Sequence, residues 1–597
     1  MNPMEVKRIF DLLPLIASKY RKDDILSAKE NGEWVKYSVA AFTENVNSLS
    51  LGLAALGYGK GDKIANISNN RPEWNFVDMA MQQLAAIHVP IYPTISESDY
   101  KFILNDAEVK LVFVSSKELY DKIRNIMPSV PSLKEVYTFD RIDGAKHWTE
   151  IRNTGLQKSS SDPSCIQQLN AVKSAVREDD LVTIIYTSGT TGSPKGVMLS
   201  HRNIVSNFTA CHDLPPCDYH DRALSFLPMC HVYERMIVYL YLYLGISVYY
   251  AESIEKIGDN LKEVKPHIFT TVPRLLEKVY DKIVAKGKDL SGIKKILFFW
   301  ALNLGLKYEL NRANGWWYEL KLKIAGKLIF SKWREALGGN VKVAVSGSAA
   351  LQPRLMRVFW AAGIPILEGY GLTETSPVIA VNNFTPGGCR FGTVGPVIPG
   401  VSVSIAPDGE ILCKGPNVML GYYKRPDLTA EVIDKNGWFH TGDIGVMEEG
   451  KYLRITDRKK EIFKTSGGKY VSPQALENKF KESPFIEQVM VVGENRNFPA
   501  ALIVPAFPYV KKWCEENGIS FSSNEDLVNN KDLKGRIYQE VSDFNKLFGK
   551  TEQVKKFELL AHEWTLDAGE LTPTLKLKRK VILEKYKDLV ERIYSGS

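Results

Sequence analysis

Residues 186–196 read YTSGTTGSPKG and directly follow the apolar, β-branched run 181–185, LVTII. Such a run predicts a buried strand, and a loop at its carboxyl end lies where open α/β sheets bind ligands. Two glycines let the backbone turn where a side chain would block a phosphate, while hydroxyls and a lysine supply donors and positive charge. The stretch therefore predicts a doubly wound α/β fold with a polyphosphate cradle. Its expected contacts are Thr187, Ser188, Gly189, Thr190, Thr191, Gly192 and Lys195.

The 597 residues exceed what one core usually contains, so two or more domains are expected. A content of 44% hydrophobic and 24% charged residues is typical of an ordered protein. Apolar stretches such as 236–250 are shorter than a membrane span, and the first twenty residues lack the long apolar core of a signal peptide. We therefore expect a cytoplasmic location.

Alternating helical and strand patterns run through the first 175 residues, with helices expected at 39–56 and 73–86 and strands at 62–67 and 109–114. This alternation predicts a parallel, doubly wound sheet, which 178–273 and 341–367 continue. From 387 to 455, short strands punctuated by Gly and Pro indicate a small β-barrel. Residues 454–461 are charged without an apolar face, and we interpret them as a connection to a smaller α+β domain.

A basic segment, 276–336, holds nearly all of the chain's net charge of +8, because it has thirteen Lys or Arg against six Asp or Glu. It also contains four tryptophans, and Trp317, Leu320, Ile324 and Leu328 follow helical spacing. Two readings stay open: a helix lying on an anionic membrane surface, at the inner face, or a core helix with a solvated basic face. Nucleic acid is not expected as a partner.

The cysteines give no sign of a disulfide framework or a zinc site. There are seven, an odd number, and no CxxC pair occurs among them. The one local cluster, within residues 211–231, mixes Cys and His without the paired short spacing of zinc ligands, so we expect no zinc.

Six further clusters recur in order along the chain. They are SFLPMCH (225–231), SGSA (346–349), EGYGLTE (368–374), TGD (441–443), DR with KTSGGK (457–458 and 464–469) and LTPTLK (571–576). In this order they resemble the adenylate-forming superfamily of acyl-CoA synthetases, luciferases and peptide-synthetase adenylation domains. The sequence TVPRLLEKVY (271–280), the basic insertion and the ending LTPTLKLKR are most similar to long-chain fatty acyl-CoA synthetases.

The resemblance implies a large AMP-binding domain at 1–457, made of two doubly wound subdomains and the barrel, a hinge at 458–460 and a smaller α+β lid domain at 461–597. It implies a ligase that uses ATP, Mg²⁺ and coenzyme A to activate a long-chain fatty acid. The acid first becomes an acyl-adenylate with release of pyrophosphate, and coenzyme A then displaces AMP. The oligomeric state stays open.

Each conserved role is carried to a residue of this chain by the same resemblance. Lys195 and its loop correspond to the pyrophosphate cradle, Glu374 to the Mg²⁺ ligand and Thr373 to the hydroxyl at the α-phosphate. Tyr370 resembles the ring that stacks on adenine, and Asp443 the carboxylate that accepts the ribose hydroxyls. The remaining residues expected beside the nucleotide are Gly347, Ser348, Glu368, Gly369, Gly371 and Arg458.

Lys576 resembles the lysine that reaches the bridging oxygens during adenylation. Many relatives have Gly directly before this lysine, whereas this chain has Leu575, so Lys578 stays an alternative. Lys460 resembles the hinge residue, Gly467 and Gly468 the loop beside pantetheine, and His231 the residue that moves aside for the thiol.

Two other functions stay open from the sequence. An acyl-AMP ligase would pass the acyl group to a carrier-protein thiol, and product analysis with coenzyme A alone would separate it from the ligase. A membrane-associated fatty-acid trafficking protein would need none of the charges described above, which argues against it.

Overall fold

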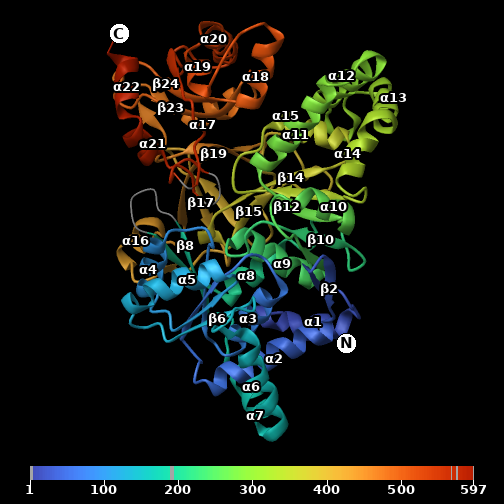
Figure 1. The fold of residues 1–597 in the computed structure, drawn as a ribbon, viewed down its shortest axis with the longest axis vertical. Coiled ribbons are helices and arrows are strands. Elements are labelled where there is room, and N and C mark those ends of the chain that lie inside the picture. The colour runs from blue at the N-terminus through green and yellow to red at the C-terminus, as the bar shows by residue number, and fades with distance from the viewer. Residues whose placement is uncertain (1–4, 188–193, 567, 573–575, 596–597) are drawn as a thin grey trace. The chain divides into compact units, whose positions relative to one another are not determined.

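The computed structural model describes residues 5–187, 194–566, 568–572 and 576–595 (Figure 1). The chain divides into two compact units. The larger comprises Met1–Val403 with Cys413–His440, and the smaller comprises Ser404–Leu412 with Thr441–Ser597. Helices and sheets alternate in both, so the predicted α/β class is confirmed.

A first sheet in the larger unit carries the strand predicted before the phosphate loop. Its central strands are parallel, and the antiparallel strands β9 and β18 close one edge. The order is β18 (Gly421–Tyr422), β9 (Lys195–Ser200), β8 (Leu181–Thr187), β4 (Ile87–Ile91), β3 (Lys63–Ile67), β5 (Leu111–Val114), β6 (Glu135–Thr138) and β7 (Lys146–His147). Strands β4 and β5 are buried throughout, as expected of a sheet covered on both faces.

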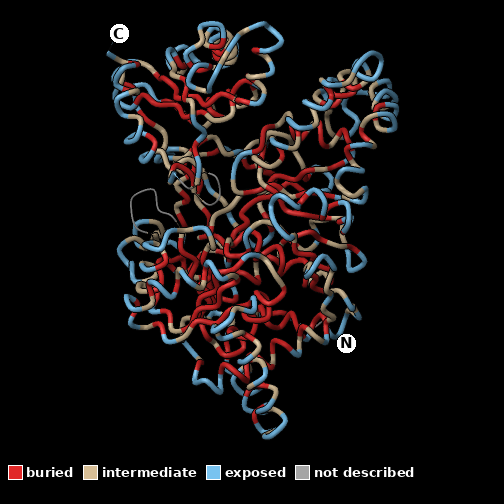
Figure 2. Tube along the Cα trace, in the orientation of Figure 1, coloured by how far each residue is buried: buried red, intermediate tan, exposed pale blue. Residues whose placement is uncertain are grey.

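A second, mostly parallel sheet makes the other half of the larger unit. Its order is β15 (Val378–Val381), β14 (Ile366–Gly371), β13 (Val343–Ser346), β12 (Ile268–Thr271), β10 (Arg222–Ser225), β11 (Ser247–Tyr250), β1 (Leu26–Glu30) and β2 (Glu33–Tyr37). The two doubly wound sheets expected from the alternating pattern are therefore present, and Figure 2 shows how much of both is buried.

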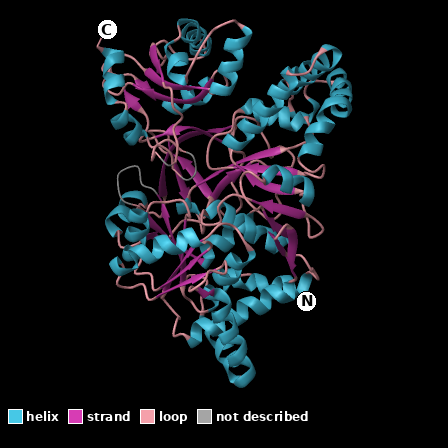
Figure 3. Cartoon of the chain, viewed as in Figure 1, coloured by secondary structure: helices cyan, strands magenta, loops and turns pink. Residues whose placement is uncertain are grey.

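Helices surround these sheets in the larger unit (Figure 3). Those connected to the first sheet are α2 (Val39–Ala55), α3 (Pro72–Gln83), α4 (Glu97–Asp106), α5 (Lys117–Ile126), α6 (Trp148–Ser161), α7 (Ser164–Ala175), α8 (His201–Ala210) and α16 (Pro426–Val432). Those associated with the second sheet include α1 (Leu12–Lys19), α9 (Val232–Leu244), α10 (Ile257–Val264) and α15 (Pro353–Ala361).

The basic segment is a lobe of consecutive helices in the larger unit. They are α11 (Pro273–Lys288), α12 (Gly292–Leu306), α13 (Trp316–Ala325), a π-helical turn (Gly326–Phe330) and α14 (Ser331–Ala336). Phe298, Ala325 and Trp333 join a hydrophobic cluster with Val358 of α15, which fixes the lobe to its sheet.

A sheet of order β16 (Ser402–Ile405), β17 (Glu410–Lys414), β19 (Phe439–Glu448) and β20 (Tyr452–Arg458) occupies the region predicted as a small barrel. One prediction is corrected here. Residues 454–458, expected in a charged connection, belong to β20 and pair with β19, with Leu453 and Asp457 buried. Because β20 lies at the edge of its sheet, its remaining charged side chains can face solvent.

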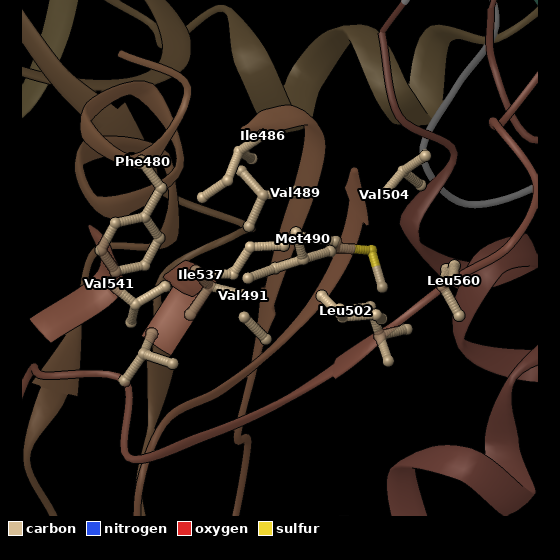
Figure 4. Close-up of a cluster of buried hydrophobic side chains, with 14 of the residues drawn as sticks. Phe480, Ile486, Val489, Met490, Val491, Leu502, Val504, Ile537, Val541 and Leu560 are labelled. Carbon is tan, nitrogen blue, oxygen red and sulfur yellow. The ribbon is translucent and has the colours of Figure 1, made fainter. Parts of the chain in front are cut away.

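The rest of the smaller unit is an α+β arrangement around β23 (Ile486–Val492), β24 (Ala500–Pro505) and β25 (Lys556–Leu559). Helices α17 (Pro473–Phe480), α18 (Phe507–Glu516), α19 (Asn524–Asn529), α20 (Lys531–Asn545), α21 (Arg579–Lys585) and α22 (Lys587–Tyr594) accompany it. Phe480, Met490, Leu502 and Ile537 fill one core between strands and helices (Figure 4).

Among the residues that the structure describes, no helix combines the length and the apolar composition needed to cross a bilayer.

Candidate active site

The phosphate-loop motif connects two paired antiparallel strands. Thr187, the last residue of β8, lies opposite Lys195, the first residue of β9, and Tyr186 lies opposite Gly196. A Cβ at Gly196 would come 2.7 Å from Cγ2 of Ile184, so the hairpin requires glycine there. The pairing holds both ends of the loop at one edge of the sheet. The predicted contacts Ser188, Gly189, Thr190, Thr191 and Gly192 lie outside the described residues.

Lys195, predicted to contact the pyrophosphate, and Glu374, predicted to bind Mg²⁺, both contact the side chain of Tyr422. The Lys195 ammonium lies 5.1 Å from the centre of the Tyr422 ring, within the range of a cation–π contact. The Tyr422 hydroxyl donates a 2.8 Å hydrogen bond to Oε1 of Glu374. Burial, and then the charge of Glu374, raise the pKa of Tyr422 far above its usual value, so this hydroxyl stays a donor.

The backbone around Glu374 is fixed by the segment that precedes β18. Thr373, Glu374 and Thr375 form a single 3₁₀ turn. The Met419 N–H donates to the Glu374 carbonyl (2.9 Å), and Asn417 Nδ2 donates to the Thr375 carbonyl (3.1 Å). Asn203 of α8 in turn donates to the Pro416 and Val418 carbonyls. These hydrogen bonds fix the backbone of the turn that carries the Glu374 carboxylate.

The donor set around Glu374 fits Mg²⁺ bound mainly through a nucleotide. Mg²⁺ prefers oxygen ligands and commonly takes one or two protein carboxylates together with phosphates and water. Among the described residues, no group of three or more His, Cys, Asp or Glu could hold an ion unaided. One carboxylate next to the phosphate-loop lysine is therefore the expected protein contribution.

The residues predicted beside adenosine lie at the ends of two adjacent parallel strands. Ser346 of β13 pairs in register with Glu368 of β14, so the turn at Gly347 and Ser348 lies next to the 369–371 segment. A Cβ at Gly371 would lie 1.8 Å from the Pro377 carbonyl oxygen, which requires glycine. In the turn at Gly347 and Ser348, Ser348 has a left-handed backbone conformation with a φ of +70°.

Two of these predicted residues differ in exposure. Tyr370 is half-buried on β14. Glu368 is buried, accepts a hydrogen bond from the Leu351 N–H (2.8 Å), and burial raises its pKa to about 8. A neutral carboxyl at that depth costs far less than a charged one.

His231 is the N-cap residue directly before helix α9. Its Nδ1 accepts a hydrogen bond from the Tyr233 N–H (3.2 Å), which caps the helix. Tyr233 also donates from its hydroxyl to the Val345 carbonyl (3.0 Å), and its ring would lie 3.1 Å from a Cβ at Gly347. Tyr233 therefore connects the His231 turn to the Gly347 turn.

The SFLPMCH loop is held by a residue from the first sheet. Asn70, just beyond β3, donates to Oγ of Ser225 (3.1 Å) and to the Leu227 carbonyl (2.7 Å), and accepts from the Met229 N–H (2.9 Å). The carboxyl ends of β3 and β10, in different sheets, are thus joined next to His231.

The other predicted residues belong to the smaller unit. Asp443 of β19 pairs in register with Arg458 of β20, whose Nε lies 3.5 Å from Oδ1 of the buried aspartate. The Asp443 N–H donates to Oγ1 of Thr441 (3.1 Å), and Gly442 has a φ of +72°. The TGD motif is thus a shaped turn that places a carboxylate against a guanidinium.

The KTSGGK motif forms a hairpin turn between β21 (Phe463–Lys464) and β22 (Tyr470–Val471). Gly468 has a φ of +72°, a left-handed backbone conformation that favours glycine. Gly467 has an ordinary φ, and a Cβ built there would meet only Oγ1 of Thr465, at 3.9 Å. Packing within the described residues therefore gives no reason for glycine at 467.

Two hydrogen bonds connect Lys576 to Thr572. Its N–H donates to Oγ1 of Thr572 (3.0 Å), and the Thr572 N–H donates to the Lys576 carbonyl (2.8 Å). Lys578 precedes α21, and its N–H donates to the Glu570 carbonyl (2.8 Å). Lys460 is exposed and directly precedes Glu461, which pairs with the half-buried Arg579 (3.2 Å).

Sequence reasoning missed Tyr422, Asn70 and Tyr233. Tyr422 carries no spacing signal, because it reaches Glu374 only through the pairing of β18 with β9. Asn70 follows a predicted strand, and a polar residue at a strand's carboxyl end was a usable signal. Tyr233 lies two residues beyond His231 but reads as a core aromatic.

Known proteins similar to this chain match it over nearly its whole length. The AMP-binding enzyme family matches residues 16–423, and the AMP-binding enzyme C-terminal domain matches residues 460–597. Long-chain-fatty-acid–CoA ligase FadD15 of Mycobacterium bovis is 35% identical over 95% of this chain and 93% of its own. Long-chain-fatty-acid–CoA ligase 1 of Homo sapiens is 32% identical over 94% of this chain and 82% of its own.

A solved structure shows the same fold. The adenylation domain of a carboxylate reductase from Mycobacterium chelonae superimposes with a TM-score of 0.75 at 21% identity, covering 100% of this chain and 92% of that one. Because one family match alone covers more than half of the sequence and full-length relatives exceed 30% identity, this chain belongs to the AMP-binding enzyme family.

Proposed function

We propose that this protein is an ATP-dependent, AMP-forming long-chain fatty acid:CoA ligase. The observation that carries the proposal is the Lys195–Tyr422–Glu374 cluster at the base of the phosphate-loop hairpin. It supplies a cation for phosphates and a carboxylate for a divalent ion. The acyl class and the thiol acceptor come from the relatives named above, which match nearly the whole chain.

The first half-reaction joins two anions. The fatty carboxylate attacks the α-phosphorus of ATP, a P–O bond forms to the acyl oxygen, and pyrophosphate leaves. Catalysis of such a step consists mainly of holding the reactants in line and cancelling their charge. We assign Lys195 to the leaving pyrophosphate and Thr373 to the α-phosphate. Mg²⁺, when bound at Glu374, would reduce the phosphate charge.

Three side chains are assigned to roles at the nucleotide by the family resemblance. Tyr370 offers a half-buried ring for adenine, beside the Gly347–Ser348 turn and the backbone of 369–371. Asp443 is assigned to the ribose hydroxyls, and the Arg458 guanidinium, 3.5 Å from Oδ1, orients its carboxylate. Lys576 is assigned to the reacting oxygens during adenylation.

The second half-reaction moves the acyl group to sulfur. The coenzyme A thiolate attacks the acyl carbonyl, a C–S bond forms, and AMP leaves with the bonding electron pair. We assign Gly467 and Gly468 to the approach of pantetheine, Lys460 to a hinge at 458–460, and His231 to a position beside the thiol path. A peripheral location at the inner face of an anionic membrane, through 276–336, belongs to the same proposal.

The test follows exchange of labelled pyrophosphate into ATP with a series of carboxylic acids from acetate to stearate. We expect exchange only when an acid is present, rising with chain length because each buried CH₂ contributes about 0.8 kcal/mol. Thioester should then form only after coenzyme A is added. Exchange that is independent of acid, or a thioester that forms only on a carrier protein, would contradict the proposal.

A further inference from the structure

Helix α13 and the π turn after it have apolar side chains on two opposite faces. The inner face, with Leu322, Ala325 and Ile329, packs into the hydrophobic cluster of the lobe. The outer face carries Trp317, Leu320, Ile324 and Leu328 at spacings of three and four residues. All four are exposed, and Leu328 has 53% of its surface accessible.

Adjacent aromatic residues enlarge this outer face. Trp316 is 68% exposed and Trp317 is 59% exposed, and their rings stack with centroids 4.2 Å apart. Helix α12, which packs against α13, begins with Ile293 and Ile296, which are 75% and 69% exposed. In Figure 2, the part of the lobe labelled α12 and α13 in Figure 1 contains exposed segments.

A surface helix of a globular protein normally places polar residues opposite its core face. Here the face opposite the core is apolar and lysines border it. Lys321 lies on one side of the stripe, and Lys323 and Lys327 lie on the other, all three exposed. Apolar and aromatic residues framed by lysines fit a layer that is apolar inside and anionic at its surface.

We propose that α13 and the π turn (residues 316–330) are a membrane-docking element, which lies in the headgroup layer of an anionic phospholipid bilayer. The tryptophan pair and the Leu/Ile stripe enter the boundary between headgroups and acyl chains, and the lysines contact phosphates. We call this surface the 316–330 stripe. It specifies which residues would contact the membrane, and it rests only on the peripheral location included in the proposed function.

The charge argues for a bilayer rather than for a second protein. The segment 276–336 has thirteen Lys or Arg against six Asp or Glu, so two copies facing each other would repel. Each lysine near an anionic membrane strengthens binding, and this contribution falls as salt rises. The apolar stripe adds a hydrophobic contribution to membrane binding that salt does not screen.

The experiment measures co-sedimentation of the full chain with vesicles of phosphatidylcholine, with and without 30–40% phosphatidylglycerol, in the absence of ATP and coenzyme A. We expect retention on the anionic vesicles that declines with salt. Reversal of three lysines (Lys321→Glu, Lys323→Glu, Lys327→Glu) should weaken binding roughly a hundredfold. The triple variant Trp317→Ser, Leu320→Ser, Ile324→Ser should lose the binding that remains at high salt.

Matched controls change similar residues elsewhere on the larger unit. Ile254 is 74% exposed and Lys435 is exposed, so Ile254→Ser and Lys435→Glu should bind like the wild type. Exchange of pyrophosphate with a short, water-soluble acid reports folding and chemistry separately from docking. All variants should retain it, since none of these residues belongs to the assigned catalytic machinery.

A depth measurement uses brominated lipids, which quench tryptophan only when it enters the acyl region. Among the described residues, Trp316 and Trp317 are the exposed tryptophans. Trp316→Phe with Trp317→Phe should keep binding but lose the quenched part of the fluorescence. Unchanged binding in the lysine and stripe variants would overturn the proposal. So would dimerisation that depends on the stripe, or quenching that survives without both tryptophans.

Discussion

The Tyr422 hydroxyl and the Glu374 carboxylate, 48 residues apart in the chain, are joined by a 2.8 Å hydrogen bond, while Lys195 lies over the same tyrosine ring. One side chain therefore positions both the cation and the anion of the site. Its ring contacts the ammonium that we assign to the phosphates, and its hydroxyl donates to the carboxylate that we assign to Mg²⁺. Tyr422 is a positioning residue in this arrangement.

Tyr422→Phe should weaken the use of MgATP without unfolding the protein. The ring stays over Lys195, but Glu374 loses a donor to its charged oxygen, an interaction typically worth about 1.5–3 kcal/mol. We expect about a tenfold fall in kcat/KM for ATP and a higher Mg²⁺ requirement, measured by pyrophosphate exchange. Tyr423→Phe removes the neighbouring hydroxyl as a control. Equal effects of both substitutions would contradict the role given to Tyr422.

Much of the fold follows from local pattern. The helices expected at 39–56 and 73–86 are α2 (Val39–Ala55) and α3 (Pro72–Gln83), and the run 181–185 lies in β8 (Leu181–Thr187). These segments carry strong apolar periodicity and clear ends, so local sequence determines them. Residues 454–458 have no such apolar periodicity. They form a strand because β20 pairs with β19, and at the edge of the sheet its charged side chains can face solvent.

The site was predictable to the extent that its residues lie in short motifs. The hairpin register at Thr187 and Lys195 follows from two strands around one loop. The Tyr422 contact depends on which strand lies next to β9, and nothing near Tyr422 in sequence reports that. Helical spacing identified the stripe at Trp317 and Leu320, but only packing decides which face of that helix is covered.

Lys576→Ala and Lys578→Ala should separate the two candidates for the adenylation lysine. The Lys578 N–H donates to the Glu570 carbonyl directly before α21, and the Lys576 N–H donates to Oγ1 of Thr572. We expect Lys576→Ala to reduce acyl-adenylate formation by about 10²- to 10³-fold, as for loss of one charge-stabilising group. Thioester formation from supplied acyl-adenylate should stay nearly intact, and Lys578→Ala should change both little. A reversed pattern would move the role to Lys578, and equal loss of both half-reactions would remove it from Lys576.

A buried ion pair joins helix α3 to α9, the helix after His231. Arg235 of α9 contacts Oδ1 of Asp78 (2.6 Å) and donates to Oγ1 of Thr183 on β8 (2.8 Å), and it also bonds the Tyr239 hydroxyl. Arg235 and Asp78 are fully buried. Removing one partner leaves the other charge unpaired in a medium of low polarity.

Arg235→Met should therefore lower the free energy of unfolding by about 3–5 kcal/mol, measured by urea denaturation. Combining it with Asp78→Asn should cost less than the sum of the single changes, because the second substitution removes the unpaired charge. The exposed pair Arg425 and Asp427 supplies a control, since Arg425→Met should have little effect. Additive losses at Arg235 and Asp78 would show that the pair is not coupled.

Glu234 makes stability depend on pH. Its carboxyl is fully buried between the hydroxyls of Ser225 (2.6 Å) and Thr270, and burial raises its pKa to about 7 from an ordinary value of 4.5. Between these values the folded state holds a proton that the unfolded state has lost. The free energy of unfolding contributed by this group therefore falls as pH rises from 4.5 to 7, by about 3 kcal/mol at most.

Glu234→Gln mimics the protonated carboxyl and should remove that dependence. Burial lowers the pKa of His88 to about 4 and of His201 to about 3, so these groups reduce stability as pH falls below 6.5. Because both histidines remain in the variant, the difference between variant and wild type isolates Glu234. We expect the variant to gain stability relative to the wild type at pH 8 but not at pH 4.5, measured by urea denaturation. As a control, Glu335→Gln at an exposed position should give a free energy of unfolding close to that of the wild type at both pH values. If Glu234→Gln changed the free energy of unfolding by the same amount at both pH values, the Glu234 carboxyl would not titrate in this window.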